Sequence, residues 1–406
     1  MAWPNKKVSS VIRRSRGTIV LAVLAPLLLG FGPGSPFFHV ETHKDGVKGV
    51  DGLRGIWCVT VSPDGKHVYA AGFREHRLAV FDRDEASGRL AFVEALRDDA
   101  GGVDGLGGVC SLAVSPEGRH VYAAGHYENA LAVFGRDPGD GRLTFIEAQR
   151  EGERGVEGLN LVQAVTISPE GKNVYAVGYR SYGMAVFRRE ETTGRLIFLE
   201  VHRDGVAGVD GLQGASDVKV SPDGGDVYAT GYLDGALAVF RRDRDTGRLT
   251  FLEVLRSGLE GVRGLRGAAS LILSPEGRHL YVAGKVDNAL VAFRRDAETG
   301  KLAFLGMEEE SLDGSQGLQA PNSVVVNPDG TYVYVAAFGD NAVSVFRREA
   351  GTGKLTLAEV LWEDEARPLG IQGPTSVAIS PDGKHLYVAG NGVQSLAVFR
   401  ISPSAP

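Results

Sequence analysis

A four-residue phrase recurs seven times in this chain, and each copy begins 53 residues after the one before it. Each copy reads Ser or Asn, Pro, Asp or Glu, then Gly, and the copies begin at Ser62, Ser115, Ser168, Ser221, Ser274, Asn327 and Ser380. No insertion breaks the spacing, so seven repeats account for residues 36–406. Self-similarity at a fixed period of this length indicates a repeat architecture in which each copy forms one supersecondary unit.

Each repeat contains four short apolar segments separated by turn residues. In the first copy they read WCVTV (57–61), HVYAAG (67–72), RLAVF (77–81) and RLAFVEAL (89–96). Runs rich in Val, Phe and Tyr between Gly- and Pro-containing turns predict strands, which we name A to D in chain order. In the A–B turn, Pro suits the fixed φ of a type I turn and Gly suits the left-handed position.

The two ends of the chain complement each other. The last repeat stops after its strand C at 395–401, whereas residues 36–42 (PFFHVET) align with strand D phrases such as 143–149 (LTFIEAQ). We therefore predict an all-β fold, a seven-bladed β-propeller with four antiparallel strands per blade. The N-terminal strand would join the C-terminal blade, which closes the ring and removes an exposed edge.

Residues 1–35 differ from the rest of the chain. Their basic residues are Lys6, Lys7, Arg13, Arg14 and Arg16. An uninterrupted apolar run follows from Thr18 to Phe31, shorter than the ~20 residues that a membrane span needs. We predict that 1–35 are a signal peptide or N-terminal anchor, that 36–406 are the propeller, and that the protein is exported to the periplasm, the cell envelope or the medium.

Charge and motifs narrow the function further. The net charge of −6 disfavours binding to a nucleic-acid backbone. The sequence holds no P-loop, no Gly-x-Ser-x-Gly elbow, no Cys-x-x-Cys pair and no His-Glu-x-x-His motif. We expect a monomer with no nucleic-acid partner.

The strand phrases also carry a resemblance. HVYAAG (67–72), HLYVAG (385–390) and VYVAAFGDNAVSVF (333–346) resemble the YVTN-type repeat, although Gly72, Gly125 and Ala337 stand where that repeat has Asn. The 53-residue unit resembles that of the seven-bladed β-propeller lactonase family, which includes a group of 6-phosphogluconolactonases. The resemblance implies a small-molecule lactone as substrate, and it provides no catalytic motif that maps onto residues of this chain.

The long D–A connections and the B–C turns would emerge on one face of the disc, where the repeats vary most, so we expect function there. The fourth repeat alone carries charges in two inner columns of strand A, at Asp217 and Lys219. One interpretation is an ion pair between blades. The other is a lactonase site in which Asp217 activates water while Lys219 and Arg180 stabilise the oxyanion.

Further residues would line the mouth of the ring. The first column of strand A varies completely and reads Trp57, Cys110, Gln163, Ser216, Ala269, Asn322 and Thr375. From it we take Trp57, Gln163 and Asn322 as candidate ligand contacts, although relaxed packing would allow the same diversity. His126 and Tyr182, on B–C turns, complete the candidate set.

Carboxylates repeat within the D–A connections of four neighbouring repeats, at Asp51, Asp104, Glu157 and Asp210. One interpretation is a divalent-cation site near the pore mouth, which would be the cofactor site of the protein. We favour the other, in which each acid caps its own glycine-flanked turn by accepting backbone N–H groups.

Two residue types remain. Cys58 and Cys110 occupy strand A of adjacent repeats, and we expect buried thiols rather than a disulfide. The histidines at a fixed position after the A–B turn are expected on the hairpin surface; they are His67, His120, His279 and His385.

Two functions stay open from sequence alone. The first is a lactone hydrolase with its site at the channel mouth. The second is a non-catalytic extracytoplasmic propeller that binds a protein or an envelope glycan through the D–A connections.

Overall fold

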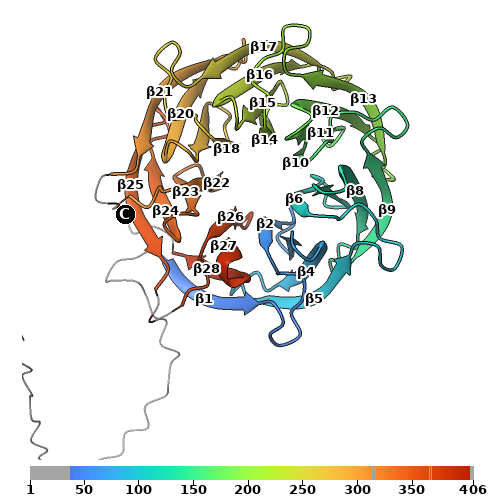
Figure 1. Cartoon of the computed structure of the whole chain (residues 1–406). Coiled ribbons are helices and arrows are strands. Elements are labelled where there is room, and N and C mark those ends of the chain that lie inside the picture. Colours follow the sequence, from blue (N-terminus) through green and yellow to red (C-terminus); the bar gives the residue numbers. More distant parts are fainter. Residues whose placement is uncertain (1–36, 312–313, 315, 365, 367, 403–406) are drawn as a thin grey trace, which may run out of the picture.

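The computed structural model describes residues 37–311, 314, 316–364, 366 and 368–402. These residues form seven four-stranded antiparallel sheets arranged as blades around a central opening (Figure 1). The predicted seven-bladed β-propeller is confirmed. None of the helices formed by the described residues has the length and apolarity to span a bilayer. The predicted signal or anchor segment, residues 1–35, lies outside the described residues.

The strands follow the order predicted within each repeat. The innermost strands, A, are β2 (Ile56–Val61), β6 (Val109–Val114), β10 (Val162–Ile167), β14 (Ala215–Val220), β18 (Ala268–Leu273), β22 (Pro321–Val326) and β26 (Pro374–Ile379). The B strands are β3 (His67–Gly72), β7 (His120–Gly125), β11 (Asn173–Gly178), β15 (Asp226–Gly231), β19 (His279–Gly284), β23 (Tyr332–Ala337) and β27 (His385–Gly390).

Strands C and D complete each blade toward the rim. The C strands are β4 (Arg77–Arg83), β8 (Ala130–Arg136), β12 (Gly183–Arg189), β16 (Ala236–Arg242), β20 (Ala289–Arg295), β24 (Ala342–Arg348) and β28 (Ser395–Ile401). The D strands are β5 (Leu90–Arg97), β9 (Leu143–Arg150), β13 (Leu196–Arg203), β17 (Leu249–Arg256), β21 (Leu302–Glu309), β25 (Leu355–Trp362) and β1 (Phe37–Lys44). A 3-10 turn, η1 (Asn391–Val393), occupies the last B–C turn.

The ring closes as the sequence predicts. The sheet order β1-β28-β27-β26 places the N-terminal strand outermost in the seventh blade, and the two strands lie side by side in Figure 1. Phe37 pairs with Ile401 and Lys44 with Ser395 along the antiparallel ladder. Residues at the two ends of the chain thus share one sheet.

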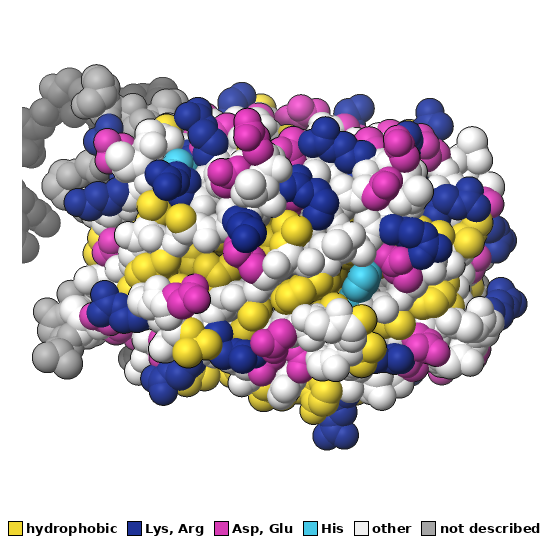
Figure 2. All heavy atoms as spheres, turned by 90° about the horizontal axis from the view of Figure 1, so that it is seen from above, with side chains coloured by type: hydrophobic (Ala, Val, Ile, Leu, Met, Phe, Trp, Pro, Cys, Tyr) yellow, Lys and Arg dark blue, Asp and Glu magenta, His cyan; other side chains and the backbone are white. Residues whose placement is uncertain are grey.

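The core lies between blades, because each blade buries one apolar face against its neighbour. Each B strand contributes a tyrosine that is at most 1% exposed, and the series is Tyr69, Tyr122, Tyr175, Tyr228, Tyr281, Tyr334 and Tyr387. Seen edge-on, the rim carries apolar side chains mainly at mid-height, with charged side chains of both signs above and below (Figure 2). The faces of the sheets are therefore buried against neighbouring blades. The loops and the channel are the surfaces that remain for a functional site.

The two faces of the disc are built differently. The loop face comprises the D–A connections and the B–C turns; within a blade they bond to each other, as where Phe73 N donates to Gly55 O at 3.2 Å. The turn face comprises the A–B and C–D turns. In each A–B turn the Gly N–H donates to the first turn residue, as from Gly65 to Ser62 O at 2.8 Å.

A buried arginine crosses most blade boundaries close to the turn face. In the second blade, Arg136 donates from Nε to Tyr69 Oη at 2.8 Å and from Nη1 to Gly118 O at 2.7 Å. Its Nη2 reaches Asp64 Oδ2 at 2.8 Å and His67 Nδ1 at 2.6 Å. We name this cluster the seam clamp. It satisfies a guanidinium that is 1% exposed, which is the condition for burying a charge.

Five more seam clamps follow the same plan. Their arginines are Arg83, Arg189, Arg242, Arg295 and Arg348. Among the described residues, the seam between the sixth and seventh blades lacks this arginine. Ile401 stands at the corresponding position and Tyr332 replaces the histidine, and both pack against the apolar core cluster of this seam.

The seam clamp overturns one expectation. His67, His120, His279 and His385 are at most 5% exposed, so the prediction of a surface hairpin role was wrong. The next blade's arginine covers each ring. The C–D turn of a neighbouring blade packs against it as well, since a Cβ on Gly141 would lie 2.2 Å from His67 Cδ2. Close approach thus explains the repeated C–D glycine.

Candidate functional site

The innermost strands enclose a channel of about 740 Å³. Its lining includes Trp57 and Gln163 from strand A, Asp217 and Lys219 from β14, and Lys285 from the turn between β19 and β20. Polar groups therefore concentrate toward the loop face. Farther along the strands the lining becomes apolar, with Val61, Val114, Ile167, Val326 and Ile379.

Most of the variable first column of strand A serves to join blades. Ser216 Oγ donates to Ala268 O at 2.6 Å, Asn322 Nδ2 to Thr375 O at 2.8 Å, and Thr375 Oγ1 to Ile56 O at 3.0 Å. Each acceptor is a backbone carbonyl of the following blade. These side chains therefore supply hydrogen bonds between the A strands of adjacent blades, which are not joined by a backbone hydrogen-bond ladder. This accounts for much of the diversity without a ligand.

Trp57 and Gln163 are the polar-tipped members of this column that form no such carbonyl bond among those described. Trp57 packs against Phe73, with ring centroids 5.5 Å apart, and Phe73 lies 5.8 Å from the ring of His126. His126 contacts Val162 O through Nδ1 at 3.2 Å, so the carbonyl fixes Nδ1 as the donor. Burial lowers the pKa of His126. These residues form an aromatic cluster on the first two blades; Trp57 lines the channel, whereas Phe73 and His126 are not part of its described lining.

Asp217 and Lys219 are brought together, and they form an ion pair within β14. Asp217 also accepts Val218 N at 2.8 Å and Leu271 N at 2.9 Å, the second from the neighbouring blade. Ser270 and Ser323 accept backbone N–H groups across their own seams in the same way, at 3.4 and 3.3 Å. The carboxylate thus performs a joining role that serines perform elsewhere, while still lining the channel.

Lys285 was missed by the sequence reasoning. Its Nζ donates to Asn322 Oδ1 at 2.8 Å and lies 5.3 Å from the centroid of the Phe338 ring. Burial lowers its pKa. No ion pair to a described carboxylate is formed, so this ammonium contributes an uncompensated positive charge to the channel wall.

A signal for Lys285 was available in the repeats. It occupies the first position of the B–C turn, a column that reads Phe73, His126, Tyr179, Tyr232, Lys285, Phe338 and Asn391. Tyr179, Tyr232 and Lys285 line the channel. Inspecting this whole column, and not His126 alone, would have identified the change from aromatic to cationic side chains around the mouth.

Arg180 and Tyr182 lie outside the channel. Arg180 is exposed, and neither residue contributes to the channel lining. Tyr182 is 42% exposed and holds a left-handed backbone with φ of 47°, which is unfavourable for a bulky residue. The structure does not gather them with Asp217.

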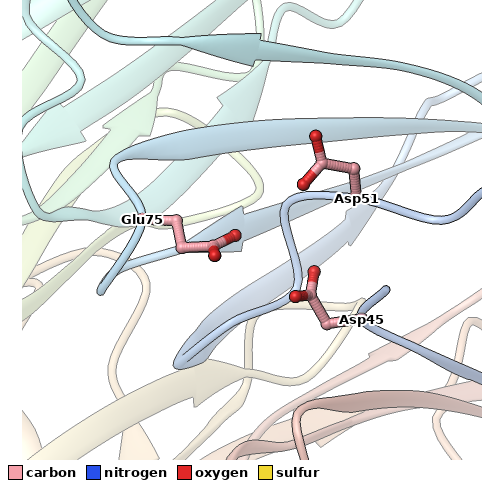
Figure 3. A group of neighbouring side chains, drawn as sticks. All are labelled: Asp45, Asp51 and Glu75. Carbon is pink, nitrogen blue, oxygen red and sulfur yellow. The ribbon is translucent and has the colours of Figure 1, made fainter. Parts of the chain in front are cut away.

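The carboxylates of the D–A connections lie over their own blades and do not line the channel. Each forms an ion pair: Asp51 with Arg77, Asp104 with Arg150, Glu157 with Arg203 and Asp210 with Arg256. Three of the four also belong to groups whose carboxylate oxygens lie within 4.8 Å of one another, namely Asp45–Asp51–Glu75, Asp98–Asp104–Glu128 and Asp204–Asp210–Asp234. In Figure 3 the first group converges from the D–A connection and the B–C turn.

These groups have the oxygen donors that a divalent cation prefers. Arginine already balances part of their negative charge. The negative charge that remains affects the pKa of Glu128. Burial and the neighbouring Asp98 raise the pKa of Glu128 to about 7. The D–A connection is capped by a different acid than Asp51, which we expected to cap it. Asp45 Oδ1 accepts Leu53 N at 2.9 Å, so the cap lies six residues before Asp51.

Both cysteines are free thiols, as expected, but only Cys110 is buried, and Cys58 is partly exposed. Burial raises the pKa of Cys58 to about 11 and raises that of Cys110 as well. Cys110 Sγ points to the backbone carbonyls of Val162 and Gln163 at 3.4 Å. Raised pKa values make both thiols poor nucleophiles.

Comparison with known proteins places this geometry in context. Residues 59–209 and 252–362 match the family model described as "Lactonase, 7-bladed beta-propeller". A 6-phosphogluconolactonase of Klebsiella pneumoniae is 25% identical over 290 residues, which are 70% of this chain and 77% of the relative.

Solved structures share the fold. The Pseudomonas aeruginosa periplasmic gluconolactonase has a TM-score of 0.62 at 23% identity, covering 80% of this chain and 92% of its own. A hydrazine synthase chain from Kuenenia stuttgartiensis has a TM-score of 0.63 at 19% identity, covering 88% and 99%. Proteins with unrelated names superpose equally well, so these structures establish the architecture and leave the activity to the residues of the site.

Proposed function

Because the chain belongs to the seven-bladed β-propeller lactonase family, we propose that it hydrolyses a lactone at the loop-face end of the channel. The observation that carries this proposal is Lys285. A partly buried ammonium that pairs with no described carboxylate and is held by Asn322 and Phe338 supports a role in polarising a carbonyl group.

The reaction needs few groups. Water adds to the lactone carbonyl carbon, and the negative charge that develops on the carbonyl oxygen is stabilised by Lys285. The ring C–O bond then breaks, the ring oxygen takes a proton to become a hydroxyl group, and the product is a hydroxy acid. Asp217 is the one carboxylate that lines the described channel, and in this proposal it accepts the proton from water.

Variants of Lys285 test the proposal. Lys285→Met should lower kcat for lactone hydrolysis by about 10²-fold or more, the cost of removing one oxyanion donor. Lys301→Met is the matched control, because Lys301 is exposed at a C–D turn on the turn face. Proton release measured in a pH-stat gives the rates. An unchanged kcat in Lys285→Met would remove Lys285 from the mechanism.

The pH profile gives a second readout. Burial lowers the pKa of Lys285, so the ammonium is lost at lower pH than for an exposed lysine, and activity should fall on the alkaline side. Lys285→Arg keeps a positive charge throughout, so any remaining activity should lose that alkaline decline.

The role of Asp217 is separable from its joining role. The double variant Asp217→Ser, Lys219→Val reproduces what the sixth blade carries at Ser323 and Val325, so the seam keeps an acceptor and no lysine is stranded. If Asp217 accepts the proton, kcat falls by about 10² or more while thermal stability stays near wild type. Full activity would assign the pair to structure alone.

We also propose that the protein acts outside the cytoplasm. The basic and apolar pattern of residues 1–35 supports export. Fractionation of cells that express the full chain, followed by N-terminal sequencing of the recovered protein, tests this. Recovery in the cytoplasm with an intact N-terminus would refute it.

A second candidate function rests on exposed apolar residues. Eight large hydrophobic side chains at least 40% exposed lie on the loop face: Val47, Tyr127, Tyr182, Val206, Leu233, Leu259, Val286 and Phe338. Exposed apolar side chains that all belong to one face are typical of binding surfaces for a protein or an envelope glycan. An envelope component retained by wild type should be lost when Val206, Leu233, Leu259 and Val286 are changed to Ser. Retention by this variant would exclude the surface.

A further inference from the structure

A cavity of about 540 Å³ opens on the turn face at the seam between the sixth and seventh blades, where Ile401 replaces the clamp arginine. Asp329 and Tyr332 of the sixth blade and Gly383 of the seventh belong to the described part of its wall. At a clamped seam these three positions hold the carboxylate, the histidine and the glycine carbonyl that surround the guanidinium. The cavity therefore lies where the other seams carry a buried cation.

The acceptors that would bind this arginine are present and lack a donor. No described cation pairs with Asp329, whereas the corresponding acid of every clamp pairs with its arginine. No described donor forms a hydrogen bond to Tyr334 Oη or Gly383 O, although the tyrosine is only 1% exposed. Burial, and then Tyr332 and Asp329, raise the pKa of Tyr334, so its hydroxyl lies within electrostatic range of both. Three acceptor groups at this seam are therefore left for a donor from outside.

The two blades approach each other as closely here as at a clamped seam. A Cβ on Gly383 would lie 3.7 Å from Pro328 Cδ. At the seam that Arg83 closes, a Cβ on Gly65 would lie at the same distance, 3.7 Å, from Pro381 Cδ. Gly383 is nevertheless partly exposed, whereas its six counterparts in the other A–B turns are buried. The seam has therefore kept its width, and the space that a guanidinium fills elsewhere is accessible.

The wall of the cavity suits a planar cation. Asp329 supplies a negative charge, and Tyr332 supplies an aromatic ring in place of the histidine. A guanidinium group stacks on aromatic rings and binds a carboxylate through parallel donors, whereas an ammonium group is a compact point charge. These two residues therefore favour a guanidinium over an ammonium.

The other charged groups of the described wall have contacts of their own or lie in solvent. Asp382 is already bound by the clamp of the next seam, at 3.1 Å. The guanidinium of Arg400 lies 4.9 Å from the centroid of the Phe38 ring, and Lys384 is exposed. Asp329 is thus the carboxylate of the described wall whose charge is left to be balanced.

We propose that this cavity is a binding site for the guanidinium group of an arginine side chain that a peptide or protein partner presents. The guanidinium donates to Asp329, Tyr334 Oη and Gly383 O, and so completes the seventh seam with an arginine from outside the chain. The same arrangement, made six times with the chain's own arginines, supports this assignment. The site lies on the turn face and does not depend on the proposed hydrolysis, which is placed at the opposite end of the channel.

The test measures binding of Nα-acetyl-arginine methylamide to the full chain, with Nα-acetyl-lysine methylamide for comparison. Ligand-observed NMR titrations give both dissociation constants. We expect saturable binding of the arginine compound and at least about tenfold weaker binding of the lysine compound, because an ammonium lacks the planar set of donors. Absence of saturable binding, or equal affinity for the two compounds, would overturn the proposal.

Methylguanidinium distinguishes a polypeptide partner from a free guanidinium compound. The stem of an arginine side chain buries apolar surface against Ile401 and Tyr332, so the arginine compound should bind more tightly than methylguanidinium. Equal affinity for the two would assign the site to a free guanidinium compound and overturn the polypeptide partner.

A variant pair locates the bound group. Asp329→Asn should weaken binding of the arginine compound about tenfold, because a neutral amide replaces the carboxylate that the guanidinium needs. Glu298→Gln is the matched control, since Glu298 is an exposed acid of a C–D turn on the same face, and its affinity should equal that of wild type. Unchanged affinity in Asp329→Asn, or an equal loss in both variants, would refute the placement at this seam.

Discussion

The seams near the turn face and the channel mouth near the loop face are made from the same seven repeats, yet they have diverged to opposite extents. At six seams an arginine meets a tyrosine hydroxyl and a carboxylate of the preceding blade in one arrangement. At the mouth, the first residue of the B–C turn is aromatic, histidine, lysine or asparagine according to the blade.

The difference shows that stability and specificity depend on different parts of each repeat. A buried guanidinium is tolerable only where every donor has a partner, so a change at one clamp residue is penalised through the others. The side chains of the mouth belong to no such repeated buried network, so a single change there costs less stability. Stability therefore resides in the uniform seams, and specificity resides in the varied mouth.

The largest expected effect comes from breaking one seam. Arg136→Ala leaves Asp64, His67 and the Tyr69 hydroxyl without their common donor, and should reduce the free energy of unfolding by about 3–5 kcal/mol. Denaturant unfolding measures it. Arg119→Ala is the control, since Arg119 is exposed one residue before strand β7. Equal, small losses from both variants would mean that the seams do not carry the stability.

The second prediction uses acid to weaken the same seams. Burial and then Arg83 lower the pKa of His385 to about 4, from 6.5. A depressed pKa means that the native state binds fewer protons than the unfolded chain, so this stability is complete above pH 6.5 and is lost as the pH falls through about 4. The full shift corresponds to about 3 kcal/mol.

His385→Asn isolates this effect. Asn173 holds the same position in the third blade, where its Oδ1 accepts Arg242 Nη2 at 2.6 Å, so the variant keeps an acceptor and removes the titration. Unfolding curves at several pH values should show a shallower acid loss in the variant than in wild type between pH 6.5 and 4. Parallel curves would contradict the assignment.

The same contrast explains what the sequence could and could not reveal. Spacing alone predicted the ring and its closure, because the turn glycines and strand phrases are local signals. It failed for His67, since burial there is produced by Arg136 and Gly141 from the next blade. Lys285 was missed because only His126 of its repeat column was considered, while the partners that hold it, Asn322 and Phe338, come from the next repeat. Contacts between repeats are invisible to a reading made one repeat at a time.

A smaller effect is expected on the loop face, at the Asp98–Asp104–Glu128 group. The pKa of Glu128 is raised to about 7, so its contribution is favourable at low pH and is lost as the pH rises through that value. Glu128→Gln should therefore stabilise the protein by about 1–2 kcal/mol near pH 8 and leave it unchanged near pH 5. Thermal melts at the two pH values test this, with Glu153→Gln, an exposed acid of the D–A connection, as control. Destabilisation by Glu128→Gln at both pH values would show that the carboxylate is needed as an ion-pair partner of Arg150.

The smallest effect should come from introducing a clamp at the seam between the sixth and seventh blades, which lacks one. Asp329 and Tyr334 are in place there, while Ile401 and Tyr332 replace the arginine and the histidine. The double variant Tyr332→His, Ile401→Arg restores the clamp residues and should stabilise the protein by about 1 kcal/mol. New charge-assisted hydrogen bonds would gain more than this, but the packing of Ile401 and Tyr332 against the apolar core cluster of this seam is lost.

Tyr332→His, Ile401→Lys is the matched control, because a lysine brings the charge without the planar guanidinium that contacts four acceptor groups at Arg136. A higher melting temperature for the arginine variant alone would show that the clamp geometry stabilises the seams. Lower melting temperatures for both variants would show that apolar packing stabilises this seam better than a clamp does. The seam belongs to the blade in which β1, from the N-terminal part of the chain, pairs with β28.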